Sequence, residues 1–378
     1  MIIGIDISSI PYGTGVSNYT QNLVLELLAI DHLNHYKLFF SSFRQKLPSD
    51  FINKLEKFPQ AQLFSYRFPP TFLSFIWNKL HIVPINWLIG PCDVFHTSDW
   101  TQPPLHKCHS VCTIHDLSPF LYPKVSDPRI IRNHKEKMYW SQKESSYFIC
   151  VSKNTQSDLL KLFPLIAASR TAIVYEAAEN KYFDFYKLKD IHKNQLIESI
   201  KIKYHLQNFI LAQGTREPRK NLHRLIKAFD KYKSQHPKST LQLAITGKYG
   251  WGNDIPLKNK DVIVLGYVDE NDLVQLHAAA VALVFPSLYE GFGLPLIKSM
   301  AVGTPVITSN TSSLAEIANK AALLVNPKSI VDIANAINKI QRQPLRRTLI
   351  SKGITQAKLF SWEKTARETL KMYQKACS

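Results

Sequence analysis

The stretch Phe285-Pro-Ser-Leu-Tyr-Glu290-Gly-Phe-Gly293-Leu-Pro295 decides the fold of this chain. It begins at the end of an apolar run, passes through a glycine-rich turn with one carboxylate, and continues into a short helix. Pro295 stands near the first turn of that helix, and Gly303 ends it. Backbone N–H groups at such a helix start can face a phosphate or a sugar oxygen, and Glu290 can accept from sugar hydroxyls. An ordinary tight turn is the alternative, but it leaves the carboxylate beside the glycines unexplained.

Outward from this stretch, short apolar runs alternate with helical patterns along both halves of the chain. The strands predicted in the first half are Ile2–Ile7, Tyr36–Ser41, Val94–Thr97, Ser110–Ile114, Phe148–Val151 and Ile173–Tyr175. Those predicted in the second half are Phe209–Gln213, Leu241–Thr246, Val262–Leu265, Val281–Phe285, Pro305–Thr308 and Leu323–Val325. Two such sets predict an α/β protein with two Rossmann-like, doubly wound parallel-sheet domains that face each other across a cleft.

The length of 378 residues also suits two domains, at roughly 100–200 residues each. A charged and poorly patterned segment over 181–207 predicts the domain connection together with a surface helix. We therefore expect an N-terminal domain over 1–180, a C-terminal domain over 181–360, and a terminal helix within 361–378.

The charge of the chain is unevenly distributed. The net charge is +18, of which residues 1–180 carry +3 and residues 181–378 carry +15. Such a surplus favours phosphate-bearing ligands, polyanions or anionic lipid, and a solvated lysine-rich surface is the alternative. No nucleic-acid-binding motif accompanies the charge, so a nucleic-acid partner is not expected.

The cysteines predict neither a disulfide framework nor a metal site. They are odd in number and irregularly spaced, at Cys92, Cys108, Cys112, Cys150 and Cys377. His106 and His109 lie near two of them, but no second ligand pair at zinc-site spacing follows. Reduced cysteines, no signal peptide and no uninterrupted apolar span indicate a cytoplasmic protein. The aromatic segment Phe68–Trp87 is interpreted as a core helix and loop, with docking on lipid as the alternative.

Two motifs in the first half follow predicted strands. Gly13 and Gly15 let the backbone turn tightly before a helix and expose N–H groups there, although they could serve the turn alone. His115 stands at the carboxyl end of a strand, where it can bind a substrate hydroxyl or carry a proton. The alternative is a structural histidine capped by Asp116.

A third motif, Gly214-Thr-Arg216-Glu-Pro-Arg219-Lys220-Asn221, lies between a strand and a helix in the second half. Clustered Arg and Lys side chains at a helix start suit a pyrophosphate, because Arg offers a planar fork and Lys a point charge. A solvated basic turn is the alternative.

Taken together, these motifs resemble the signature of retaining GT-B glycosyltransferases, specifically their large fourth family. The resemblance is carried by Gly214–Asn221 and Pro286–Glu316, and it covers essentially the whole chain. Further pieces agree in order and spacing: the Gly13/Gly15 loop, His115-Asp116-Leu117, Val151-Ser152 and Phe360-Ser-Trp362.

The resemblance implies that the C-terminal domain holds a nucleotide sugar and the N-terminal domain presents the acceptor. The terminal helix would cross back to the N-terminal domain. Glu290 would bind donor-sugar hydroxyls, and Arg219 and Lys220 would neutralise the departing diphosphate, with Arg216 contributing. His115 would contact the donor sugar near the reacting centre. The other donor-binding residues would be the glycine loop and the turn amides, namely Gly13, Gly15, Gly291, Phe292, Gly293 and Leu294.

The resemblance is nearest to bacterial and archaeal polysaccharide and O-antigen mannosyltransferases. It implies a hexosyltransferase that needs no metal or cofactor, leans towards GDP-mannose, and acts on a glycan or lipid-linked acceptor at the inner face of the cell membrane. A catalytically silent GT-B scaffold or sugar-nucleotide-binding partner subunit is the alternative.

Lys298 is the sharpest departure from the family pattern. The family has a second Glu at this position, eight residues after Glu290, where it accepts hydrogen bonds from the nucleotide ribose. A lysine ammonium has three donors and no acceptor. We expect Lys298 to lie near the donor site and to alter donor affinity while activity is kept. Pairing with a carboxylate and loss of activity are the alternatives.

Overall fold

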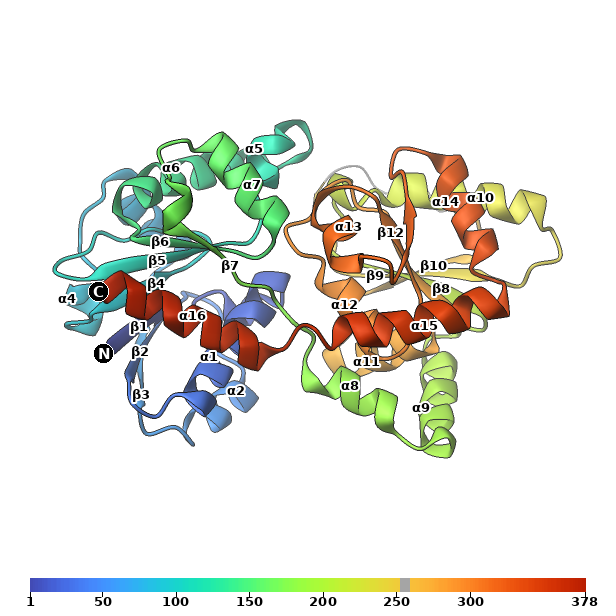
Figure 1. Cartoon of the computed structure of the whole chain (residues 1–378), viewed down its shortest axis with the longest axis horizontal. Helices are drawn as coiled ribbons and strands as arrows, with labels where there is room; N and C mark the ends of the chain where they lie inside the picture. Colours follow the sequence, from blue (N-terminus) through green and yellow to red (C-terminus); the bar gives the residue numbers. More distant parts are fainter. Residues whose placement is uncertain (252–258) are drawn as a thin grey trace. The chain divides into compact units, whose positions relative to one another are not determined.

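The computed structural model describes residues 1–251 and 259–378, and these form two compact units (Figure 1). The first unit comprises Met1–Pro123, Asp127–Glu176 and Ser361–Ser378. The second comprises Lys124–Ser126 and Ala177–Phe360. The chain therefore leaves the first unit, builds the second, and returns to complete the first.

The first unit is built on a seven-stranded sheet in the order β3-β2-β1-β4-β5-β6-β7, with every neighbouring pair parallel. Its strands are β1 (Ile2–Asp6), β2 (His35–Ser41), β3 (Ala61–Tyr66), β4 (Val94–Thr97), β5 (His109–Ile114), β6 (Tyr147–Cys150) and β7 (Thr171–Ile173). Its helices are α1 (Gly15–Ile30), α2 (Ser49–Leu55), α3 (Pro70–Leu73), α4 (Asn86–Ile89), α5 (Ser118–Leu121), α6 (Pro128–Glu144), α7 (Lys153–Leu162) and α16 (Trp362–Cys377).

The second unit has a six-stranded parallel sheet in the order β10-β9-β8-β11-β12-β13. Its strands are β8 (Phe209–Gln213), β9 (Gln242–Thr246), β10 (Val262–Gly266), β11 (Ala282–Phe285), β12 (Val306–Ser309) and β13 (Leu323–Val325). Its helices are α8 (Asn180–Lys187), α9 (Asp190–Lys203), α10 (Leu222–Gln235), α11 (Glu270–Ala279), α12 (Leu294–Ala301), α13 (Ser312–Ala318), α14 (Ile330–Lys339) and α15 (Gln343–Ala357). Short helical turns in the chain are η1 (Ile10–Tyr12), η2 (Ser74–Lys79), η3 (Pro123–Val125), η4 (Ala168–Arg170) and η5 (Pro218–Lys220).

The predicted fold class of two Rossmann-like parallel-sheet units is confirmed. Helices cover the sheets, so strands such as β11 are buried on both faces and are unbroken apolar runs in the sequence.

α1 shows how local sequence determines where a helix begins and which face it buries. The Thr14 hydroxyl accepts from the Ser17 N–H, and Ser17 accepts in return from the Thr14 N–H. Tyr19, Leu23 and Leu27 then recur at helical spacing and are buried.

Each sheet has one topological switch point, where the chain reverses its direction of growth across the sheet. In the first unit it lies between β1 and β4, and in the second between β8 and β11. In open sheets of this kind, ligands bind outside the carboxyl ends of the strands at such a point. The loops that follow these four strands are therefore where the functional groups are to be sought.

The segment Phe68–Trp87 folds into α3, η2 and the start of α4. Trp77 is fully buried in a core cluster with Phe39 and Phe95, whereas Trp87 is 75 % exposed. The segment therefore contributes to the core, as interpreted from the sequence, and also leaves aromatic surface. Across the described residues, none of the helices is both long enough and apolar enough to traverse a lipid bilayer.

Candidate functional site

The two motifs of the second unit lie side by side at its switch point. The basic turn follows β8 and includes η5, and the glycine-rich turn follows β11. Asn221 joins them, since its side-chain amide donates to the carbonyls of Pro286 at 2.9 Å and Pro327 at 2.7 Å. The Leu288 N–H donates to the Arg219 carbonyl at 2.9 Å. These bonds hold together two motifs that are about seventy residues apart in sequence.

Arg219, Lys220 and Glu290 meet in one ionic cluster. Arg219 Nη1 lies 2.8 Å from Glu290 Oε2, and Lys220 Nζ lies 2.7 Å from Glu290 Oε1. Arg219 Nη2 also pairs with Glu217 Oε1 at 2.6 Å. Burial by itself raises the pKa of Glu290, but the two cations outweigh it and hold the pKa below its usual value. The cluster therefore combines two cations with two carboxylates, Glu290 between both cations and Glu217 on Arg219, beside the end of a buried strand.

The glycine-rich turn requires a glycine at position 293, and hydrogen bonds from the Ser313 side chain hold its backbone in place. Gly293 has a φ of +106° at the N-cap of α12, and an added Cβ would lie 2.7 Å from Leu314 Cδ2. Ser313 Oγ donates to the carbonyls of Glu290 at 2.8 Å and Phe292 at 3.0 Å. The predicted donor-binding backbone from Gly291 to Leu294 is thus held at the start of α12, next to the ionic cluster.

The Arg216 side chain does not join the ionic cluster of Arg219, Lys220 and Glu290. Its backbone N–H donates to the Lys248 carbonyl at 2.9 Å, and its guanidinium carbon lies 5.2 Å from the centroid of the Tyr249 ring. Among the residues that the structure describes, no hydrogen bond or ion pair joins Arg216 to Glu290. The structure therefore brings together Arg219, Lys220 and Glu290, and leaves Arg216 outside that cluster.

Lys298 lies on α12 and is only 3 % exposed. Its Nζ pairs with Glu270 Oε1 at 2.6 Å and Glu179 Oε1 at 3.1 Å, and lies 5.1 Å from the centroid of the Tyr182 ring. Burial lowers the pKa of Lys298, but the two carboxylates outweigh burial and raise it above the usual value. The ammonium is therefore charged, and carboxylates engage two of its three donors, which is the pairing weighed as an alternative.

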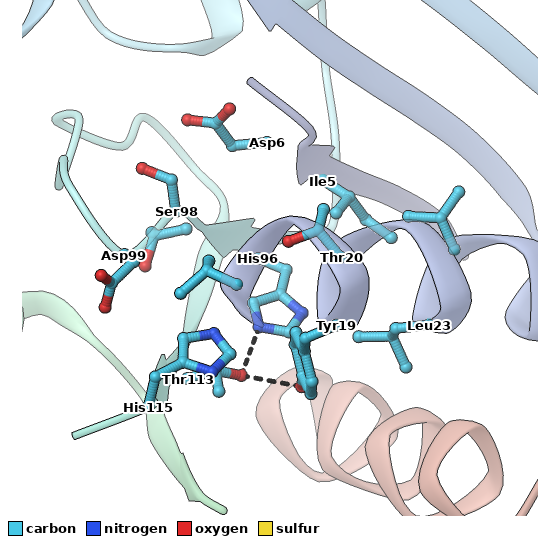
Figure 2. Close-up of a pocket in the computed structure, with 13 residues that line it drawn as sticks. Ile5, Asp6, Tyr19, Thr20, Leu23, His96, Ser98, Asp99, Thr113 and His115 are labelled. Carbon is cyan, nitrogen blue, oxygen red and sulfur yellow. Dashed lines mark hydrogen bonds between the residues drawn. The ribbon is translucent and has the colours of Figure 1, made fainter. Parts of the chain in front are cut away.

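The first unit has a pocket at its own switch point (Figure 2). His115 lines it, directly after β5. The His115 Nδ1 lies 3.2 Å from Glu176 Oε1, and the ring meets that of Tyr19 edge-on at 4.6 Å between centroids. Asp116 instead accepts from the Ser118 N–H at 2.9 Å and hydroxyl at 2.7 Å. Glu176 is thus a carboxylate that faces His115.

A second histidine, His96, also lines the pocket. His96 Nδ1 is 2.6 Å from the Tyr373 hydroxyl, and its Nε2 is 2.8 Å from Thr113 Oγ1. Figure 2 shows the Thr113 hydroxyl joined to both His96 and Tyr19. Burial lowers the pKa of His96 to about 3, so this ring is neutral and structural. No motif in the sequence distinguishes this buried histidine from His115.

The two glycines of the first loop have different roles. Gly13 closes η1 with a φ of +64°, a conformation that favours glycine. Gly15 is the first residue of α1, and an added Cβ there would meet nothing within 4 Å. The turn explains Gly13, whereas Gly15 leaves open space at the helix start.

The Cys and His residues in β5 and in the segment just before it do not form one common cluster. Cys108 Sγ lies 2.9 Å from Cys92 Sγ, while Cys112 accepts from Lys137 Nζ at 3.2 Å. In residues 1–251 and 259–378, no group of three or more His, Cys, Asp or Glu side chains is placed to hold a metal ion.

Comparison with known families agrees with this geometry. Residues 13–178 match the family model described as Glycosyltransferase Family 4, and residues 194–356 match the model described as Glycosyl transferases group 1. The two matches cover most of both units. The chain belongs to the GT-B glycosyltransferases.

Individual relatives of this glycosyltransferase point the same way. O-antigen chain mannosyltransferase B of Escherichia coli is 29 % identical over 380 residues, covering 96 % of each chain. O-antigen chain mannosyltransferase RfbU of Salmonella typhimurium is 29 % identical over 260 residues, covering 67 % of this chain and 65 % of that one. Among solved structures, sucrose-phosphate synthase from Thermosynechococcus elongatus has a TM-score of 0.74 at 21 % identity, over 99 % of this chain and 98 % of that one. This last likeness shows the fold.

Proposed function

We propose that this glycosyltransferase is a retaining enzyme of the family-four type. It moves mannose from a nucleotide-sugar donor to a glycan or lipid-linked acceptor in cell-surface polysaccharide synthesis. The observation that carries the proposal is the cluster of Glu290, Arg219 and Lys220 at the second switch point. The relatives named as O-antigen mannosyltransferases support both the sugar and the pathway.

The cluster suits the charge that develops during glycosyl transfer. When the bond between the anomeric carbon and the diphosphate oxygen breaks, negative charge collects on the diphosphate. Arg219 and Lys220 can stabilise that charge because they are preorganised and shielded from water. A bound diphosphate would compete with Glu290 for the two cations, which frees Glu290 oxygens to accept from sugar hydroxyls. Two cations supply the neutralisation that a metal would otherwise provide.

Retention follows from attack on the same face. The acceptor oxygen forms its bond to the anomeric carbon on the side that the diphosphate leaves, and its proton passes to the departing phosphate oxygen. A double displacement would instead need a carboxylate placed as nucleophile near the anomeric carbon.

Exposed Phe72, Phe75 and Trp87 support contact with the inner face of the membrane if the acceptor is lipid-linked.

A donor screen tests the proposal. Thermal unfolding is measured with UDP-, GDP- and ADP-sugars, and any sugar that binds the native protein raises the melting temperature. We expect GDP-mannose to give the largest shift and to be hydrolysed slowly without acceptor. The anomeric configuration of the transfer product, read by NMR, should match that of the donor. A protein that binds and hydrolyses none of these donors would instead be the silent scaffold.

A further inference from the structure

Two cysteine thiols face each other just before β4 and β5. Cys92 Sγ lies 2.9 Å from Cys108 Sγ, and both cysteines are free. The two strands are parallel neighbours, with Val94 paired to His109 in their register. A disulfide bond is about 2.05 Å long, so the two sulfurs would have to approach by less than about 1 Å to form one. The irregular cysteine spacing in the sequence does not single out this pair.

Hydrogen bonds hold the two cysteine-bearing segments together. The Asn86 side-chain amide donates to Cys92 Sγ at 3.6 Å, and its carbonyl oxygen accepts from the His106 N–H at 3.0 Å. The Asp93 carbonyl accepts from the His109 N–H at 2.9 Å. One asparagine therefore ties the first cysteine to the segment that carries the second. The short distance between the sulfurs follows from backbone that is fixed on both sides.

The two thiols differ in their exposure to solvent. Cys92 is 4 % exposed and belongs to a core cluster with Phe95, against which Cys108 packs. Cys108 itself is half-buried and stands between the exposed Lys107 and His109. A small molecule in solvent therefore reaches the pair from the Cys108 side.

The surroundings of Cys92 favour loss of its proton. The Cys108 S–H donates to Cys92 and lowers the pKa of that thiol, and Lys37 and Asn86 act in the same direction, against burial, which raises it. The Lys37 ammonium is held in place, since its Nζ donates to the Pro91 carbonyl at 2.9 Å. Thiolates rather than thiols are the nucleophiles in cysteine oxidation and disulfide exchange.

We propose that Cys92 and Cys108 are a modification site, at which a peroxide produces a reversible disulfide. A thiolate of the pair attacks one oxygen of hydrogen peroxide and becomes a sulfenic acid, while the other oxygen takes up a proton and leaves as water. The second thiol attacks the sulfenic sulfur, the S–S bond forms, and a second water leaves. In sum, two thiols lose two electrons and two protons, and one peroxide is reduced to two waters.

The disulfide would close a ring around residues 93–107, which contain β4 and the loop after it. Ser98, in this loop, lines the pocket at the switch point of the first unit. Joining the two ends restricts the unfolded chain and limits local opening of the segment. Disulfides that form in cytosolic proteins are usually transient and redox-sensing. The pair thus makes the stability of the first unit depend on the redox state of its surroundings.

Thiol counting and peptide mass spectrometry test the site on the whole chain. The reduced protein is treated with a small molar excess of hydrogen peroxide, denatured, alkylated and digested without reduction. We expect the number of free thiols to fall from five to three, with Cys92 and Cys108 in one cross-linked peptide pair. Dithiothreitol should return the count to five. Oxidation should also raise the melting temperature by about 5 °C.

Three substitutions assign the bond. Cys108→Ser, at a half-buried position, should lose both the cross-link and the rise in melting temperature. Cys112→Ala should keep the cross-link, a necessary control because Cys108 and Cys112 fall in the same tryptic peptide. Cys377→Ser should keep it as well. Cys377 lies on α16, where its charge acts on both members of the pair.

Four results would overturn the proposal. All five thiols could persist in the natural protein, the pair could be oxidised to sulfinic acids without a cross-link, or the cross-link could join Cys377 to one of its members. The fourth is an equal rise in melting temperature in Cys108→Ser. The peptide analysis of the natural protein is decisive even if Cys108→Ser does not fold.

Discussion

The two switch points share a topology and differ in charge. In both units candidate side chains lie beside a pair of neighbouring parallel strands, β1 and β4 in one and β8 and β11 in the other, and in the first unit His115 follows the next strand, β5. The second region collects Arg219, Lys220 and Glu290, and the first collects Asp6 and Asp99 without a lining Lys or Arg. The shared topology thus places both groups of side chains at equivalent positions in their sheets, while the loops after the strands set the charge there.

Lys298→Glu should have the largest effect. It would place a third carboxylate beside Glu179 and Glu270, in a buried network that the lysine now neutralises. We expect a loss of about 3–5 kcal/mol in the free energy of unfolding, measured by urea denaturation. Lys181→Met, which removes an exposed partner of Glu270, should cost about 1 kcal/mol or less. A Lys298→Glu variant that is as stable as the natural protein, or that gains donor affinity, would show that the lysine is no structural partner.

Lys220→Met should weaken the basic region specifically. The variant keeps the stem of the side chain and removes a charge-assisted contact to the diphosphate. We expect nucleoside-diphosphate affinity, measured by calorimetry, to fall by roughly 1.5–3 kcal/mol. Lys320→Met, on an exposed lysine of the same unit, is the control and should bind normally. Equal affinity and turnover in Lys220→Met and the control would remove Lys220 from the donor site.

His115→Ala should lower turnover more than stability. Loss of one hydrogen bond to the reacting sugar is expected to reduce kcat about 10- to 100-fold, with a melting temperature close to that of the natural protein. The exposed His109→Ala is the matched control. A variant that unfolds, or one with full kcat, would contradict the assignment of His115 to turnover.

The smallest effect on the free energy of unfolding is expected from substitution of Asp6. Its sign distinguishes Asp6 of the first region from Glu290 of the second. The pKa of Glu290 is lowered in the fold, so its ionised form stabilises the protein above its usual pKa, and this contribution is lost as pH falls. The pKa of Asp6 is raised, so ionised Asp6 costs stability at neutral pH. Asp6→Asn should therefore stabilise the protein at pH 7 by up to about 1 kcal/mol.

The gain from Asp6→Asn should vanish below about pH 4, where Asp6 is protonated in both the folded and the unfolded chain. Urea denaturation from pH 3 to pH 8 measures this. A gain that persists at low pH would mean that burial of the charge is not its cause.

Periodicity predicted most strands of both sheets, because strands buried on both faces are continuous apolar runs. It missed β3, whose residues Ala61–Tyr66 are largely exposed at the edge of the sheet and show no such run. It placed the last strand of the first unit at Ile173–Tyr175, whereas β7 spans Thr171–Ile173. A threonine at a half-buried strand start gives a weaker signal than the apolar residues that follow.

Candidate site residues could be predicted from sequence where one local motif contains the charged side chains and the glycines that suggest the chemistry. Glu290 and the basic turn were identified from local sequence, and the structure brings them together. Glu176 was missed, because it faces His115 only through the fold, the two residues being 61 positions apart in sequence. Lys298 was recognised as unusual, but its partners Glu179 and Glu270 could not be found from spacing.

The return of the chain to the first unit has a consequence for biosynthesis. α16 supplies the Tyr373 hydroxyl to His96, the ring of Trp362 to Tyr19, and the Thr365 hydroxyl to the Tyr175 carbonyl. These residues leave the ribosome only after the entire second unit has been made. The first unit to be translated therefore cannot complete its packing until the second unit has been synthesised.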